Sequence, residues 1–286
     1  MGCLSCAGFV KEMGGATRLT LKGPLSAVVE ADCLNPESLA GRTLHEIAAL
    51  PVLIGMEKGT LGDVFDIEPG LTEDVFLEGD LSKVDGIGKG MAHGRLTVLG
   101  DAGAHLGANM RGGEILVQGD AGEYAGAQTT GGFIRIRGDA GDRAGALYPG
   151  RTKGGDGGTL LIEGRAGDEL GAGMRRGLIA VRGNAGDFAG TRMIGGTLFI
   201  FGTPGDLAGT GNKRGTIVVL GDYGGPTASY VLSCTYSPTF LDCFYKQFRE
   251  WEWDLPGGVE SGPYRRYVGD QNVNGKGEIL VFTKSQ

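Results

Sequence analysis

The stretch from Gly94 to Ser233 repeats one glycine-rich unit seven times. The copies are GRLTVLGDAGAHLGANMRG (94–112), GEILVQGDAGEYAGAQTTG (113–131), GFIRIRGDAGDRAGALYPG (132–150), GTLLIEGRAGDELGAGMRR (158–176), GLIAVRGNAGDFAGTRMIG (177–195), GTLFIFGTPGDLAGTGNKR (196–214) and GTIVVLGDYGGPTASYVLS (215–233). They begin 19 residues apart, except that a seven-residue insertion around 148–156 separates the third copy from the fourth. A weaker copy, VFLEGDLSKVDGIGKGMAH (75–93), precedes them. A fixed period of this length indicates a stacked repeat architecture.

Each unit opens with a pattern typical of a short strand. The second and fourth residues after its first glycine are always aliphatic, and a spacing of two puts both on one face of a strand. These pairs are Leu96/Val98, Ile115/Val117, Ile134/Ile136, Leu160/Ile162, Ile179/Val181, Leu198/Ile200 and Ile217/Val219. The positions between them are mixed, as at Thr97, Arg135, Glu163 and Arg182, so we expect one buried face and one outward face.

A single unit cannot bury its aliphatic pair alone, whereas stacked units can. The sequence therefore predicts an all-β protein, a right-handed parallel β-helix of about seven to eight 19-residue coils. Seven coils at a strand separation of ~4.8 Å would form a column roughly 34 Å long. Small residues such as Ala125, Ala144 and Ala189 suit a narrower wall. Paired helices are excluded by the number of glycines, and leucine-rich repeats by the scarcity of leucine.

Two glycines punctuate each unit, one closing the strand segment (Gly100 to Gly221) and one three residues later (Gly103 to Gly224). We expect them to supply positive φ or room for a neighbouring backbone where the chain turns a corner.

The regions outside the repeats are expected to be small α/β caps, which gives three segments: 1–74, 75–233 and 234–286. Asn35-Pro36 predicts a helix start, and Thr43 with Glu46 predicts a capping box. Residues 52–70 are expected to form a strand and a turn. Phe240, Phe244 and Phe248 lie four apart on a helix that should cover the open last coil. Residues 279–282 predict a terminal strand.

Composition excludes several classes of protein. The chain has 57 glycines among 286 residues, 41% hydrophobic and 21% charged residues, and a net charge of −7. A disordered chain would be less apolar, and a nucleic-acid binder usually carries a basic patch. We expect no membrane span and no secretory signal. Five cysteines in so long a chain favour a reduced, cytoplasmic protein.

No residue pattern predicts catalysis. His45, His93 and His105 occur in three different contexts and are expected to be ordinary surface or satisfied histidines. Cys3 and Cys6 form half of a zinc or redox signature, without a second half. The run Gly86–Gly90 contains Lys89 like a phosphate loop, but no Ser or Thr follows the lysine, which favours a tight turn. We therefore expect no catalytic, cofactor-binding or metal-binding residue in this chain.

Two surfaces have a composition that suggests interaction. Cations recur at the coil ends, where they form either a solvated edge or a docking stripe for an acidic partner or a polyanionic tail; they are Arg111, Arg175, Arg176, Lys213 and Arg214. Outward strand positions are unusually apolar and predict a patch that either a partner protein or the chain's own capping segments cover. These positions are Leu116, Phe133, Leu161, Phe199, Phe201 and Val218. A partner protein of a complex is the favoured occupant.

Several stretches resemble one known family. The glycine repeat is similar to the C-terminal domain of the glutamate synthase large subunit and to the C subunit of formylmethanofuran dehydrogenase. The flanking sequences favour the second. The similar stretches are LTL (19–21), VEADCLNPESLAGRTLHEIAALPV (29–52), LGDVFDIEPG (61–70), GDLSKVDGIGKGM (79–91), AHLGANMRGG (104–113), RRYVGD (265–270) and GKGEILVF (275–282).

The resemblance implies a non-catalytic structural subunit of a cytoplasmic enzyme complex. Its partners would be an amidohydrolase-like subunit with metals, a formyltransferase subunit and a molybdopterin-like subunit. The family has two branches: the bacterial formyltransferase/hydrolase complex of one-carbon metabolism, which uses tetrahydromethanopterin and a methanofuran-type carrier, and the Mo/W formylmethanofuran dehydrogenase of methanogens. The excess of 17 Arg over 10 Lys favours the first. A free-standing glutamate-synthase-like domain is the remaining alternative.

Overall fold

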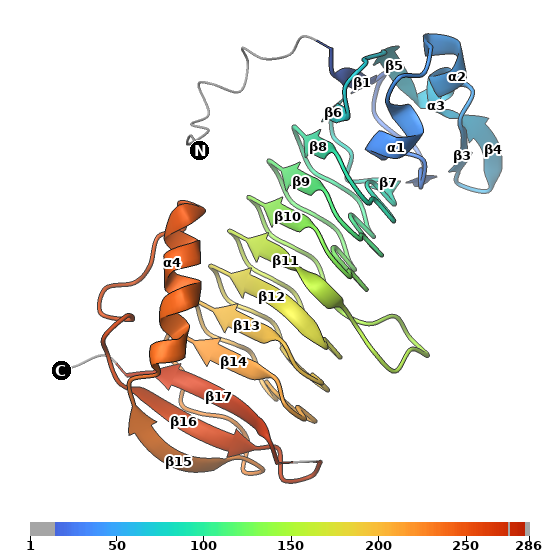
Figure 1. Ribbon diagram of the computed structural model, residues 1–286. Coiled ribbons are helices and arrows are strands. Elements are labelled where there is room, and N and C mark those ends of the chain that lie inside the picture. The colour runs from blue at the N-terminus through green and yellow to red at the C-terminus, as the bar shows by residue number, and fades with distance from the viewer. Residues whose placement is uncertain (1–14, 274, 284–286) are drawn as a thin grey trace.

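The computed structural model describes residues 15–273 and 275–283 (Figure 1). A 13-stranded sheet runs the length of the molecule, in the order β15-β16-β17-β14-β13-β12-β11-β10-β9-β8-β6-β1-β5. All neighbours from β1 to β17 pair in parallel, and the pairings at the two ends are antiparallel. The strands of the repeats are β6 (Asp74–Glu78), β8 (Arg95–Val98), β9 (Glu114–Val117), β10 (Phe133–Ile136), β11 (Asp156–Ile162), β12 (Arg176–Val181), β13 (Thr197–Ile200) and β14 (Thr216–Val219).

The aliphatic pairs of the repeats stack in register, as predicted. Leu96 lies opposite Ile115, and Ile115 opposite Ile134. The insertion does not disturb the columns, since Ile134 pairs with Leu160 across it. All fourteen predicted inward residues are at most 4% exposed. Burying such side chains contributes about 1.5–3 kcal/mol each, so these two columns supply much of the core.

The second half of each repeat returns along a narrower wall. Single parallel bridges join equivalent residues, five of them alanine, from Leu81 through Ala102, Ala121, Ala140, Ala166 and Ala185 to Pro204. Ala125, Ala144 and Ala189 are completely buried, which agrees with the expectation that small residues form this wall. In the following turn, Gly107 and Gly145 have φ of 60° and 66°, a conformation that glycine adopts at little cost.

The Gly-Asp pairs of the repeats belong to one hydrogen-bonded ladder. The backbone N–H of Asp120 donates to Asp101 Oδ1 at 2.8 Å, and that of Asp139 donates to Asp120 Oδ1 at 2.7 Å. A Cβ on Gly138 would collide with the Asp120 carboxylate and lie 2.7 Å from the Gly119 carbonyl carbon. Glycine is therefore required at this corner because a carboxylate and a neighbouring backbone occupy the space.

The N-terminal segment adds strands at one end of the stack. It consists of β1 (Thr17–Leu21), β2 (Val29–Glu30), α1 (Pro36–Leu39), α2 (Leu44–Ala48), β3 (Pro51–Ile54), β4 (Glu57–Thr60), α3 (Leu61–Val64) and β5 (Phe65–Glu68). β1 pairs in parallel with β6, and a second sheet has the order β4-β3-β2-β7, where β7 is Val84–Asp85.

Local sequence signals predicted part of the secondary structure of this segment. The predicted caps are confirmed, since Asn35 Oδ1 accepts from Ser38 N at 2.9 Å and Thr43 forms a capping box with Glu46. The expectation of one strand and a turn for residues 52–70 was too simple. Thr60 and Asp63 form a further capping box that starts α3, and β5 then pairs with β1.

The C-terminal segment corrects another expectation. It contains β15 (Val231–Tyr236), a 3₁₀ turn η1 (Thr239–Leu241), α4 (Asp242–Glu250), β16 (Tyr264–Gly269) and β17 (Gly277–Phe282). The predicted terminal strand is confirmed as β17, which pairs with β14. The prediction that the helix covers the open last coil was wrong. β17 already satisfies the backbone of β14, so α4 packs beside the stack instead (Figure 1). Among the described helices, none is long and apolar enough to span a membrane.

Candidate interaction surfaces

The outer face of the sheet is apolar over its C-terminal half, and α4 covers it. Phe199 is fully buried, with its ring centroid 5.0 Å from that of Phe248 on α4 and nearly perpendicular to it. Leu161 and Val218 are also completely buried in the same cluster. The favoured prediction of a partner protein on this wall was therefore wrong here, because an amphipathic helix of the same chain supplies the apolar cover.

The segment after α4 extends this cover toward the middle of the sheet. The ring centroids of Phe201 and Trp253 are 5.7 Å apart, and those of Phe133 and Trp251 are 5.3 Å apart. Arg182 was expected to point outward as an ordinary polar residue. The prediction of an outward position is confirmed, and the guanidinium lies 4.8 Å from the ring centroid of Trp253 on this outer face, close enough for a cation–π contact. Of the predicted apolar patch, Leu116 and Phe133 remain only half-buried.

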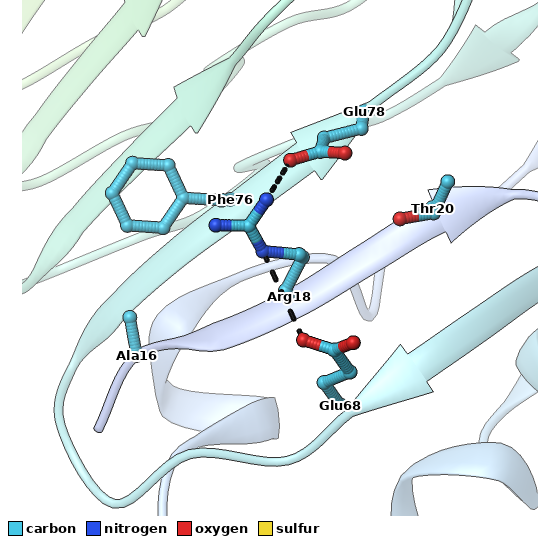
Figure 2. A pocket seen from close by; sticks show the side chains of 6 residues that line it. All are labelled: Ala16, Arg18, Thr20, Glu68, Phe76 and Glu78. Carbon is cyan, nitrogen blue, oxygen red and sulfur yellow. Dashed lines mark hydrogen bonds and ion pairs between the residues drawn. The ribbon is translucent and has the colours of Figure 1, made fainter. Parts of the chain in front are cut away.

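The other end of this outer face is polar. Arg18 on β1 lies between Glu68 on β5 and Glu78 on β6, beside the ring of Phe76 (Figure 2). These side chains, with Ala16 and Thr20, line a cavity of about 430 Å³. One guanidinium faces two carboxylates here, and Glu68 is 82% exposed at 3.9 Å from Arg18 Nε. Two ion pairs within the chain thus engage the guanidinium of Arg18.

The three histidines lie in three separate contexts, as predicted from the sequence. His45 is exposed on α2. His93 lies between two carboxylates, with Nδ1 3.0 Å from Glu73 and Nε2 3.9 Å from Glu37. Among the described residues, no group of three His, Cys, Asp or Glu side chains could hold a metal ion. Cys3 and Cys6 lie outside the described residues.

The run Gly86–Gly90 forms a tight turn. The N–H groups of Gly86, Gly88 and Gly90 donate to the carbonyls of Ala104, Leu34 and Ala108 at 2.8–2.9 Å. A phosphate loop needs such groups free to point at the ligand. Lys89 Nζ is 2.6 Å from Asp32 Oδ2. The backbone donors and the lysine are therefore engaged within the chain, in agreement with the tight-turn interpretation.

The predicted basic column is discontinuous. Arg111, Arg175 and Lys213 occupy equivalent positions of their repeats, but Thr130, Pro149 and Ile194 occupy that position in the units between them. Arg175 and Arg176 both pair with Asp156, at 3.1 and 3.5 Å. Lys213 and Arg214 are exposed. These cations are therefore separate groups rather than one stripe.

Sequence reasoning missed a cluster of rings at the base of the insertion. Tyr148 reaches back over two units, and its ring lies 5.0 Å from that of Tyr124 and 5.5 Å from that of His105. Burial, with the nearby Tyr124, raises the pKa of Tyr148 to about 12. The phenol therefore keeps its proton at neutral pH and can donate to His105 Nδ1 at 2.9 Å. The only signal in the sequence was the single 26-residue spacing.

The fold and these surfaces together define a repeat protein of stacked parallel strands, closed at both ends by antiparallel strands. Comparison with a solved structure identifies its family. The chain is 37% identical to a chain in the crystal structure of the formyltransferase/hydrolase complex FhcABCD from Methylorubrum extorquens, solved in complex with methylofuran; the match covers 93% of this chain and 100% of that chain, with a TM-score of 0.87. The chain belongs to the family formed by the C subunits of formylmethanofuran dehydrogenase and of the Fhc complex.

Curated relatives match over a shorter stretch. The C subunit of the Fhc complex of Methylorubrum extorquens is 38% identical over 88 residues, which is 31% of this chain and 33% of that protein. The C subunit of a molybdenum-containing formylmethanofuran dehydrogenase from Methanothermobacter marburgensis is 39% identical over 91 residues, 31% of this chain and 23% of that protein. These matches thus span about a third or less of the relatives' length. No family model matches the chain.

Proposed function

We propose that this chain is a non-catalytic structural subunit of a formyltransferase/hydrolase complex. The observation that carries the proposal is the match along 93% of the chain to one chain of such a complex. The complex would move a formyl group from tetrahydromethanopterin to a methanofuran-type carrier and release formate. Reactive groups and metals would belong to the amidohydrolase-like, formyltransferase and molybdopterin-like subunits, while this chain holds no cofactor.

The architecture supports a scaffolding role. We propose that the stacked units are the seven to eight coils of a right-handed parallel β-helix spanning 75–233, and that segments 1–74 and 234–286 act as caps. Such a rod presents long, continuous faces, which suits the positioning of other proteins. We also propose a cytoplasmic location, in keeping with a reduced, acidic chain.

The C subunit of a formylmethanofuran dehydrogenase is the second candidate, because molybdenum- and tungsten-containing members also match this chain. The two candidates differ in the metals of the assembled complex. A free-standing glutamate-synthase-like domain is less well supported, since the matched relatives are subunits of complexes.

Purification of the tagged chain from its natural source tests the proposal. We expect the other three kinds of subunit to be recovered with it, with formyl transfer and hydrolysis in the complex and neither activity in the isolated chain. Molybdenum or tungsten in stoichiometric amount would favour the second candidate. A chain that purifies without partners, or that alone releases formate from a formylated carrier, would contradict the structural role.

A further inference from the structure

The insertion between β10 and β11 is the one interruption of the 19-residue period between residues 94 and 233. The insertion loop, residues 148–155, projects from the stack on the side opposite α4 (Figure 1). Since Ile134 and Leu160 pair in register across it, the loop is not needed for continuity of the stack. Its role must therefore be sought in what it presents outside the stack.

The tip of the insertion loop has a defined conformation. Arg151 N donates to Tyr148 O at 3.0 Å, with Pro149 and Gly150 between them, and Gly150 has φ of 79°. Proline followed by a glycine of positive φ is the pattern of a type II turn. A tip held in this way loses little conformational freedom on binding, which favours affinity.

The base of the loop is fixed on both sides. Tyr148 stacks on Tyr124 and bonds to His105, as described above. On the returning side, Gln128 Nε2 donates to the Lys153 carbonyl at 2.8 Å, and Gly154 N donates to Gly173 O at 2.8 Å. The loop is thus a supported projection rather than a slack connection.

The charge of this projection is opposite to that of the whole chain. Arg151 at the tip and Lys153 on the returning side are exposed, and among the described residues no partner engages either side chain. At the base, Arg175 and Arg176 share the single carboxylate of Asp156. The insertion loop itself carries two cations and no carboxylate, on a chain whose net charge is −7.

We propose that the insertion loop is a docking element that inserts its cationic tip into an acidic surface of a neighbouring protein of the complex. This inference rests on the proposed function, since it requires a complex. Charge pairs of this kind set the association rate and the partner choice, and the prearranged tip limits the entropic cost. The whole chain has a net charge of −7, so a cationic projection is an electrostatically favoured point of contact for an acidic partner.

Charge reversal in the full chain tests the proposal. Arg151→Glu/Lys153→Glu is compared with Lys213→Glu/Arg214→Glu, an equal change of charge at another exposed corner of the stack. Tagged chains are recovered from cells that make all subunits, in KCl from 50 to 300 mM, and the retained subunits are quantified. We expect the loop variant to recover at least about tenfold less of one subunit than the wild-type chain does. The control variant should recover that subunit within about threefold of the wild-type amount. Both variants should keep the wild-type melting temperature.

A photo-crosslinking amino acid at Thr152 supplies the second measurement. The expected product joins the loop to a peptide of the lost subunit that is rich in Asp and Glu. Full retention by the loop variant, equal loss in both variants, or a crosslink to an apolar or basic peptide would each overturn the docking role and leave the proposed function intact. Absence of partners for the wild-type chain would instead contradict the proposed function itself.

Discussion

Removal of one ring from α4 should release the cover of the outer face without unfolding the stack. Phe248 is completely buried and packs within 5.0–6.1 Å of the rings of Phe199, Phe201, Trp251 and Trp253. Truncation of a buried phenylalanine to alanine costs about 3–5 kcal/mol. The nine residues of α4 are fewer than the ~12–15 that an isolated helix needs in water, so α4 cannot persist once it leaves the wall.

Hydrogen exchange by mass spectrometry measures this opening directly. We expect Phe248→Ala to reduce the protection of α4 amides by about a thousandfold, since each 1.4 kcal/mol corresponds to a factor of ten. Strands β8 and β9, far from α4, should keep their protection. The control Phe240→Ala removes a ring that is 43% exposed and should change protection less than tenfold. Equal effects of the two variants, or a uniform loss along the stack, would refute the assignment of α4 as a separate cover.

Two further predictions concern the Gly-Asp ladder. Gly138→Ala should lower the free energy of unfolding, measured by urea titration, by about 1–3 kcal/mol, because the added Cβ meets backbone and carboxylate atoms. The control Gly224→Ala should change it by less than about 0.5 kcal/mol, because a Cβ there meets nothing within 4 Å. Similar urea midpoints for the two variants would contradict the steric argument. Asp139 accepts the N–H and guanidinium of Arg165, and the backbone bond chiefly holds its pKa below the usual 3.8. The stability that this carboxylate adds is present above pH 3.8 and lost as pH falls through its lower folded pKa. The difference in free energy of unfolding between the wild-type chain and Asp139→Asn should therefore shrink in acid. A difference that stays constant from pH 7 to 2 would refute this role of Asp139.

The repeated part of the fold could be predicted because each unit states the same local pattern. Alternation at two-residue spacing predicts a strand, and repetition at 19 residues predicts which strands are neighbours, so the columns from Leu96 to Val219 could be assigned from the sequence alone. Helix caps at Asn35 and Thr43 were equally local, since each bond spans three residues.

Contacts between distant parts of the chain were harder to predict. The docking of Phe248 on Phe199 and Phe201 depends on which face of the sheet remains uncovered after β17 pairs with β14. No local sequence pattern indicates which face that is. Tyr148 reaches His105 across 43 residues, over units whose own pattern gives no hint of it. The predicted basic column failed for a simpler reason: Thr130, Pro149 and Ile194 occupy the equivalent positions of the intervening units, so the cations are not neighbours in the stack.

The in-register stacking across the insertion has a geometric consequence for any assembly built on this chain. Each complete unit advances the stack by one strand separation, ~4.8 Å, whereas extra residues within a unit leave that advance unchanged, as Ile134 opposite Leu160 demonstrates. The length of the stack is therefore set by the number of whole units. The distance between proteins bound at its two ends would change only if the chain gained or lost whole units. Insertions such as the insertion loop can vary in length without altering that distance.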